Sequence, residues 1–329
     1  MRIFYRLTPH IKSITKNSVL AIGIFDGLHL GHQKILKTVV AKAKKENLPA
    51  GVMSFYPHPD RILNHQRIKL IQTLEQRLEF FRKFGLDYCL ILSLDSEMAS
   101  LSGEDFVRLI LKDTLQIKQV VVGENFRFGH RRHCGVHELK SYGKKYGFKV
   151  RALKPIKKDG HLVSSSLLRR LLEAGRVEEV WKLLGRPYQI QGQVVKGEGV
   201  GQKLGFPTAN LKTENEILPP GVYISKVAYR NEVFPSVTNI GFRPTFGGEK
   251  LLVEAHLLDF SGRLYGKKLS LFLLKKIRPE KKFSSVEKLK EQIGKDIQLA
   301  REYFKQKRRT STDLLDFQPD LAKYKFFKS

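Results

Sequence analysis

The amino-acid sequence predicts two domains: a doubly wound α/β domain with a parallel sheet, followed by an antiparallel β-barrel with a terminal helix. In the first half, short apolar runs alternate with amphipathic helical patterns. After LLGRPY, at 183–188, strand-like runs follow one another with glycine and proline turns between them. A chain of 329 residues is long enough for about two ordinary hydrophobic cores. We place the domains at 1–185 and 186–310, and predict no structure for the tail at 311–329.

The first domain is predicted from the alternation of two hydrophobic periods. Apolar runs predict strands at 19–24, 51–55, 88–94 and 119–122. Apolar residues at helical spacing predict helices around 35–43, 74–84 and 106–115. Near-continuous apolar strands that alternate with helices are typical of a parallel sheet covered on both faces.

The second domain is predicted from consecutive strands without intervening helices. The runs lie at 188–195, 222–229, 234–240, 251–258 and 269–275. Such a series, with turn residues between the runs, is typical of an antiparallel barrel or sandwich. A final helix is expected to begin near Ser284, where SSVE is a capping box, and to end at about Lys307.

Composition excludes several classes of protein. No apolar run reaches the roughly 18 residues that a membrane span needs. The start, MRIFYRLTPHIKS, lacks the apolar core of a signal peptide. The two cysteines, Cys89 and Cys134, form no CxxC motif, which argues against a disulfide scaffold and suits a reducing compartment. We therefore expect a cytoplasmic protein that does not bind a membrane.

The net charge of +28 is large and evenly spread. Up to Gly185 there are 33 basic and 17 acidic residues, a charge of +16, and after it 27 and 15, a charge of +12. Nucleic acid, anionic small substrates and a generally basic surface all fit such a balance. The charge alone does not choose among them.

The stretch FDGLHLGHQKIL, at 25–36, lies where the first predicted strand turns into a helix. It places His29 and His32 three positions apart among closely spaced glycines. Ligands of doubly wound sheets bind beyond the carboxyl ends of the strands, and a helix that begins there attracts phosphate. Two partly buried histidines that cap a helix are the alternative. HxGH directly after an apolar strand favours nucleotide binding.

Further motifs narrow the interpretation. SFYPHP (54–59), GENFRFGHRRHCG (123–135) and VSSSLLRRLL (163–172) follow predicted strand ends or begin a helix. Together with HxGH, they resemble the HxGH nucleotidylyltransferases, and among these the adenylyltransferase module of the bacterial bifunctional riboflavin kinase/FAD synthetase. KGEGVGQKLGFPTANL (196–211), SVTNIGFRPTFGG (236–248) and VEAHLLDFSGRLYG (253–266) resemble the riboflavin kinase module of the same family.

This resemblance implies that the first domain transfers the adenylyl group of ATP to FMN. His29 and His32 are then the catalytic donors to the reacting phosphates. The flavin side is expected at Pro57, His58, Asn125 and Arg127. The resemblance places the remaining ATP contacts at Gly23, Phe25, Asp26, Gly27, Ser165, Ser166 and Arg169. For the serines, an ordinary helix cap is the alternative.

The resemblance also implies that the second domain phosphorylates riboflavin. Thr208 and Asn210 of PTAN lie two apart, so on an extended segment both face one side, and their neutral oxygens suit Mg²⁺. Glu254 is the expected base for the riboflavin 5′-hydroxyl, with a solvent-facing strand residue as the alternative. Arg243 and Arg278 are expected near the flavin. ATP contacts are expected at Gly197, Gly199, Gly201, Lys203, Gly205, Pro207, Thr208 and Asn210.

Some alternatives stay open. HRRHCGVH gathers His130, His133, Cys134 and His137, but no second ligand pair stands at zinc-finger spacing, so a solvent-exposed basic loop is favoured over zinc.

Rival functions are a basic nucleic-acid-binding protein, a nucleotidylyltransferase with another phosphate acceptor, and a flavin sensor with inactive sites. The expected ligands are ATP, riboflavin and FMN, without specific nucleic acid. The oligomeric state is left open.

Overall fold

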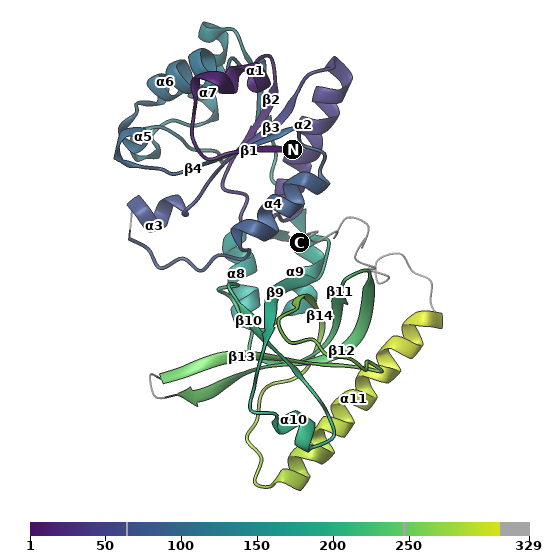
Figure 1. Ribbon diagram of the computed structural model, residues 1–329. Helices are drawn as coiled ribbons and strands as arrows, with labels where there is room; N and C mark the ends of the chain where they lie inside the picture. Colours follow the sequence, from purple (N-terminus) through teal and green to yellow (C-terminus); the bar gives the residue numbers. More distant parts are fainter. Residues whose placement is uncertain (64, 246–247, 310–329) are drawn as a thin grey trace. The chain divides into compact units, whose positions relative to one another are not determined.

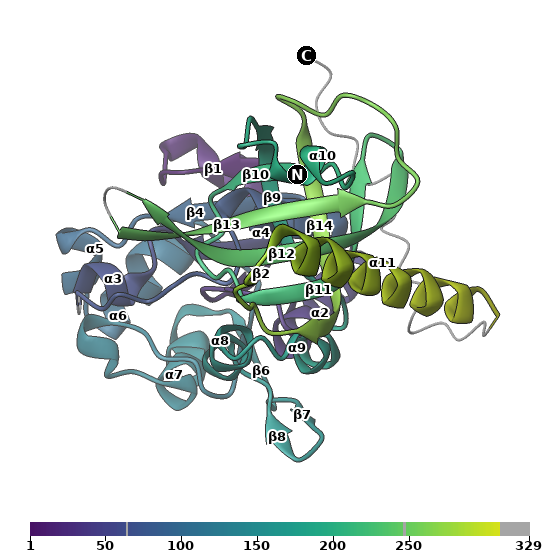
Figure 2. The same ribbon diagram turned by 90° about the horizontal axis from the view of Figure 1, so that it is seen from below.

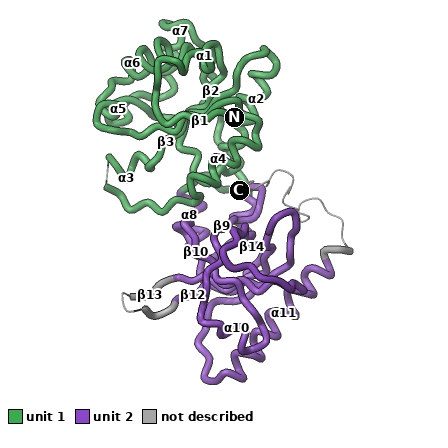
Figure 3. Tube along the Cα trace, viewed as in Figure 1, with its two compact units in different colours: residues 1–165 green, residues 166–329 purple. Residues whose placement is uncertain are grey.

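The computed structural model describes residues 1–63, 65–245 and 248–309. The chain divides into two compact units, Met1–Ser165 and Ser166–Ser329 (Figure 3). The boundary that we place near Gly185 comes after α8 (Ser165–Glu173) and α9 (Val177–Leu184), and it stays a prediction. The tail at 311–329 lies outside the described residues.

The first unit is built on a six-stranded sheet with the order β1-β4-β3-β2-β5-β6. Figure 1 labels β1, β2, β3 and β4 of this sheet. Every neighbouring pair in it is parallel, which confirms the predicted fold class. A short antiparallel hairpin of β7 and β8 follows the sheet. The strands are β1 (Arg2–Phe4), β2 (Val19–Ile22), β3 (Ala50–Phe55), β4 (Tyr88–Leu92), β5 (Gln119–Gly123), β6 (Lys149–Leu153), β7 (Lys157–Lys158) and β8 (His161–Leu162).

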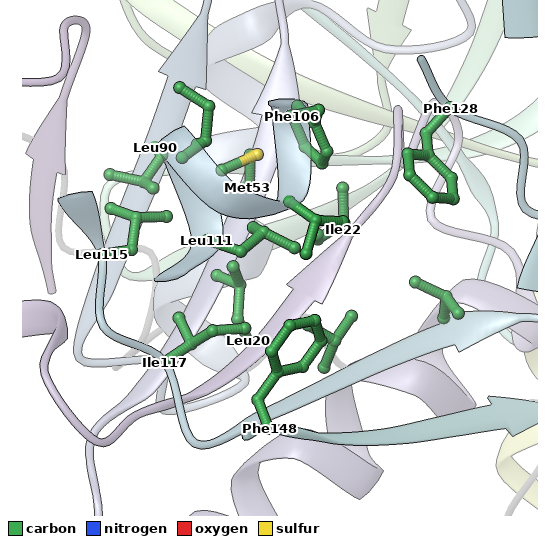
Figure 4. Packing of buried hydrophobic residues seen from close by; sticks show 14 of the residues in the cluster. Leu20, Ile22, Met53, Leu90, Phe106, Leu111, Leu115, Ile117, Phe128 and Phe148 are labelled. Carbon is green, nitrogen blue, oxygen red and sulfur yellow. The ribbon is translucent and has the colours of Figure 1, made fainter. Parts of the chain in front are cut away.

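Helices cover both faces of this sheet, because successive residues of each buried strand point to opposite faces. Leu20 and Ile22 pack with residues of η2, such as Phe106 and Leu111 (Figure 4), and with residues of η1 and α7. Val19 and Ala21 pack with α2 and α4. The helices are η1 (Pro9–Ile11), α1 (Lys12–Thr15), α2 (Leu30–Glu46), α3 (Pro59–Leu63), α4 (Leu74–Lys83), α5 (Ser96–Ser100), α6 (Gly103–Asp105), the π-helical η2 (Phe106–Thr114), η3 (His130–Arg132) and α7 (Val136–Tyr146).

The second unit is a closed barrel with the order β10-β13-β12-β11-β14-β9, and all its neighbouring pairs are antiparallel (Figure 2). This confirms the predicted barrel. Two short helices, α9 and α10 (Val200–Lys203), accompany it, and α11 (Val286–Arg309) ends the described chain. The strands are β9 (Tyr188–Val195), β10 (Ala209–Thr213), β11 (Gly221–Tyr229), β12 (Glu232–Thr245), β13 (Gly248–Leu257) and β14 (Lys268–Arg278).

The terminal helix packs on the outside of the barrel. Ala300 of α11 is fully buried against Val222, Leu258 and Leu274. The N-terminal cap of α11 differs from the prediction, because the Ser285 hydroxyl, not that of Ser284, accepts a bond from the Lys288 N–H at 3.3 Å. In the described ranges, no helix is both long and apolar enough to cross a membrane.

Candidate active sites

A tight turn joins β2 to α2 and carries the two histidines predicted to bind phosphate. The backbone φ angle is positive at Phe25 (56°), Gly27 (83°) and Leu28 (44°). L side chains rarely adopt this region, and such residues persist only where the surroundings hold them. The turn is therefore a strained element that requires fixed neighbours.

Side-chain hydrogen bonds supply that support. The Asp26 carboxylate is 1% exposed and accepts bonds from the N–H groups of Ile71, at 3.0 Å, and Gln72, at 3.4 Å. The Ser165 hydroxyl donates to the Asp26 carbonyl at 2.8 Å, and the Gln33 amide donates to the Leu28 carbonyl at 2.9 Å. Asp26 and Ser165 thus hold the turn, and their contact with ATP stays a prediction.

His29 and His32 lie together at the N-terminus of α2. His29 is the N-cap, and its Nδ1 accepts a bond from the His32 N–H at 3.3 Å. The two rings stack with their centroids 3.7 Å apart. Because Nδ1 accepts, the neutral His29 ring carries its proton on Nε2 and donates from there. The positive end of the helix dipole lies at the same place, so the site suits an anion.

Gly31, between the two histidines, leaves little room for a side chain. A Cβ at Gly31 would lie 3.1 Å from the His29 ring, and one at Gly23 would lie 3.2 Å from the Phe25 ring. Such contacts are tighter than side chains normally make, so a larger residue would push the rings aside. Sequence reasoning names Gly23 and Gly27, but not Gly31, as ATP contacts.

The other predicted residues of the first unit follow neighbouring strands. Pro57 and His58 come after β3, and Asn125 and Arg127 come after β5, on either side of β2 in the sheet order. The carboxyl ends of parallel strands meet at one edge, so these loops share the edge that carries the HxGH turn. His58 is buried, whereas Asn125 and Arg127 are exposed.

The histidine cluster after β5 extends from η3 into α7. The His130 Nδ1 lies 3.2 Å from the Ala99 carbonyl oxygen, and the His137 side chain is 94% exposed. Across the described residues, no three His, Cys, Asp or Glu side chains are arranged to hold a metal ion. Ser166 and Arg169, the remaining predicted ATP contacts, lie on α8 in the second unit.

The second candidate site lies where the loop between β9 and β10 packs on the PTAN segment. A Cβ at Gly197 would lie 2.3 Å from the Asn210 amide nitrogen. One at Gly201 would lie 2.5 Å from the Phe206 carbonyl oxygen and 3.1 Å from the Thr208 hydroxyl. These two glycines allow the loop to touch both predicted metal ligands.

Two further glycines of this loop have backbone angles that favour glycine. The φ angle is positive at Gly199 (72°) and Gly205 (87°), where a residue with a side chain would be strained. Lys203 ends the short helix α10 between them, and Pro207 follows shortly after.

Glu254 lies beside Asn210 on neighbouring antiparallel strands. The two residues are direct partners in the pairing of β10 with β13. Val253 and Ala255 are buried, so Glu254 points to the outer face of the barrel, where it is half-buried. The alternating sequence pattern thus predicts correctly that Glu254 lies on the outer face of the barrel. It does not reveal that Asn210 is its neighbour on the adjacent strand.

Of the two arginines predicted near the flavin, the structure describes the side-chain contacts of Arg278 only. Arg278 forms an ion pair with Asp296 of α11, with the Nη2–Oδ2 distance at 2.8 Å and the Nε–Oδ1 distance at 3.1 Å. Asp296 is 2% exposed, so this pair anchors α11 to β14. The flavin contact of Arg278 stays a prediction. The side chain of Arg243 lies outside the described residues.

Sequence reasoning missed two side chains at these sites. Arg77 lies on the buried face of α4 behind the HxGH turn, and its signal was a charged residue at helical spacing among Leu74, Leu78 and Phe81. His256 lies two residues after Glu254, and its Nδ1 is 2.8 Å from the Pro207 carbonyl oxygen. An alternating strand pattern gives no signal for such a bond.

Comparison with known proteins identifies a family for each of the two parts of the chain. Residues 11–167 match the FAD synthetase family model, and residues 184–304 match the riboflavin kinase model. A bifunctional riboflavin kinase/FMN adenylyltransferase from Buchnera aphidicola (subsp. Schizaphis graminum) is 39% identical over 90% of this chain and 96% of that protein. One with the same name from Escherichia coli K12 is 37% identical over 87% and 92%.

A solved structure resembles the whole chain. The crystal structure of a protein named as a macrolide-efflux protein, from Streptococcus pneumoniae, has a TM-score of 0.83 and 28% identity, and covers 92% of this chain and 99% of that one. The order of the two family models agrees with the names and the extent of the two relatives. The chain therefore belongs to the family of bifunctional riboflavin kinases/FMN adenylyltransferases.

Proposed function

We propose that this chain is an enzyme of flavin cofactor synthesis that carries out two successive reactions. The second unit phosphorylates riboflavin with ATP to give FMN, and the first unit adenylylates FMN with a second ATP to give FAD and pyrophosphate. The observation that carries the proposal is the pairing of Glu254 with Asn210 beside the glycine loop, in a chain that also has the HxGH turn.

In the kinase reaction, Glu254 accepts the proton of the riboflavin 5′-hydroxyl. The hydroxyl oxygen then forms a bond to the γ-phosphorus of ATP. The bond between the γ-phosphorus and the oxygen that bridges it to the β-phosphate breaks, and ADP leaves. The loop from Gly197 to Gly205 wraps the phosphates, as glycine-rich loops do. Positioning and charge stabilisation supply most of the rate enhancement in such transfers.

Thr208 and Asn210 fit a magnesium ion. The two residues lie on either side of buried Ala209, so they face the same side of the chain, and Asn210 is the strand partner of Glu254. Mg²⁺ prefers oxygen ligands and binds through few protein groups together with substrate phosphates, so this small set suffices. The ion would neutralise charge on the phosphates of ATP.

In the adenylyl transfer, an FMN phosphate oxygen bonds to the α-phosphorus of ATP and pyrophosphate leaves. The phosphate is already ionised, so no protein base is required. His29 donates from Nε2 to oxygens that gain charge, and His32 acts beside it at the helix N-terminus. Asn125 and Arg127 contribute to the flavin side.

The decisive experiment incubates the full-length protein with riboflavin, ATP and Mg²⁺, and separates the products by chromatography. FMN should appear first and FAD later. With FMN as the starting flavin, FAD should form directly together with pyrophosphate. If neither flavin product appears, the proposal is wrong. If riboflavin is phosphorylated but FMN is not adenylylated, the reaction proposed for the first unit is wrong.

A further inference from the structure

Arg77 is a buried arginine that the reactions above do not use. It lies on α4, is 1% exposed, and is among the largest fully buried side chains in the described part of the protein. A buried cation is costly unless hydrogen bonds or an opposite charge compensate it. Its position therefore requires an explanation.

The hydrogen bonds of Arg77 converge on the chain just before the HxGH turn. A single nitrogen, Nη1, donates to the Ile24 carbonyl at 2.8 Å, the Ser54 hydroxyl at 3.1 Å and the Phe55 carbonyl at 3.2 Å. The Ser54 hydroxyl in turn donates to the same Ile24 carbonyl at 2.9 Å. Ile24 directly precedes Phe25, the first residue of the turn with a positive φ angle.

One short segment thus holds the turn at two points. The N–H groups of Ile71 and Gln72, just before α4, bind the Asp26 carboxylate, and Arg77 of α4 binds the Ile24 carbonyl. Thr73 and Gln76 form a capping box between them, which fixes the start of α4. Burial lowers the pKa of Arg77, and the nearby Asp26 carboxylate opposes this shift.

We propose that Arg77 is a positioning residue for adenylyl transfer: by fixing Ile24, it holds the strained turn that places His29 and His32 against the reacting phosphates. The inference rests on the proposed adenylylation of FMN. A displacement of about 1 Å in a catalytic group can cost on the order of 10²-fold in rate. Loss of Arg77 releases the turn without removing any group that touches ATP.

The test compares four variants of the full-length protein. Arg77→Met removes the donors, and Arg77→Lys keeps a charged nitrogen with three donors. Ser54→Ala removes the second donor to Ile24. Arg82→Met is the matched control, because it makes the same change at an exposed position of the same helix. Formation of FMN from riboflavin, by the other unit, reports in each variant on the folding of the rest of the chain.

The expected kcat for FAD formation falls on the order of 10²-fold in Arg77→Met and less in Arg77→Lys and Ser54→Ala, and stays unchanged in Arg82→Met. Amide hydrogen exchange should rise only around residues 24–32 in Arg77→Met, including the His32 N–H that binds His29. A purely structural role would instead raise exchange throughout the sheet, including β4 and β5, and would overturn the proposal.

Unchanged FAD formation in Arg77→Met would also overturn it. If Arg77→Met does not fold, Arg77→Lys and Ser54→Ala decide: a lower kcat with local exchange supports the proposal, and wild-type rates contradict it. Failure of the wild-type protein to make FAD from FMN would refute the proposed function itself, a separate result obtained before any variant is made.

Discussion

At the scale of single residues, the two histidines of the HxGH turn should affect only one of the two activities. Replacing His29 or His32 with Ala removes a donor to the transition state, which typically costs on the order of 10²–10³ in rate. FAD formation from FMN should fall by this factor while FMN formation from riboflavin continues. Chromatographic assays with each starting flavin measure both. Equal loss of both activities would point to misfolding.

Glu254 should show the opposite pattern. Glu254→Gln keeps size and shape but removes the base, so riboflavin phosphorylation should fall by roughly 10²-fold or more. FAD formation from supplied FMN should survive, because that reaction belongs to the first unit. FAD formation from riboflavin should fail for lack of FMN. Near-normal FMN production would remove Glu254 from the mechanism and leave it a strand glutamate on the outer face.

At the scale of elements, the loop between β9 and β10 should tolerate no side chain at Gly197. In Gly197→Ala the new Cβ would lie 2.3 Å from the Asn210 amide, so the loop or Asn210 must shift. We expect the KM of the kinase for ATP to rise while FAD formation from FMN is unaffected. Gly294→Ala on α11 is the matched control, because nothing lies within 4 Å of its Cβ position. It should leave both activities unchanged and stabilise the helix slightly.

If Gly197→Ala binds ATP as the wild type does, the close packing of this loop on PTAN is not required for catalysis. Steady-state kinetics over a range of ATP concentrations, with riboflavin saturating, make the comparison. Thermal unfolding of both glycine variants separates an effect on ATP binding from a general loss of stability.

The elements that the sequence predicts best are the buried ones. The four central strands of the sheet have near-continuous apolar runs and were found within two residues of their bounds. The edge strands β1 and β6 were missed, since β1 has three residues and β6 alternates exposed Lys149 and Arg151 with partly buried positions. In the barrel, β10 was missed because a motif with polar residues occupies it.

The candidate sites also have some features that the sequence pattern predicts and others that it misses. Motifs located the HxGH turn and PTAN, because phosphate binding constrains residue type over short spacings. Contacts between distant segments, such as Arg77 with Ile24 or Asn210 with Glu254, depend on strand order and register, which short-range patterns do not encode. The bond from Ser165 to Asp26 likewise joins segments far apart in the sequence.

At the scale of the whole molecule, the charge of +28 should serve solubility and attraction of anionic substrates. The charge is divided evenly, +16 up to Gly185 and +12 after it, so neither half of the sequence concentrates the positive charge. We expect only weak binding to DNA or RNA that falls steeply with salt concentration. Fluorescence anisotropy with several unrelated sequences at physiological salt tests this. Nanomolar affinity that depends on sequence would refute it.

Part of that positive charge has a consequence for behaviour at high concentration. In the described sheet, β6 has β5 on one side and no strand on the other, so it is an edge strand. Exposed Lys149 and Arg151 stand along this edge, and Pro155, which lacks an N–H, follows it closely. Charges and prolines at an open edge oppose edge-to-edge pairing between molecules. These residues therefore protect the protein against aggregation, whatever its ligands are.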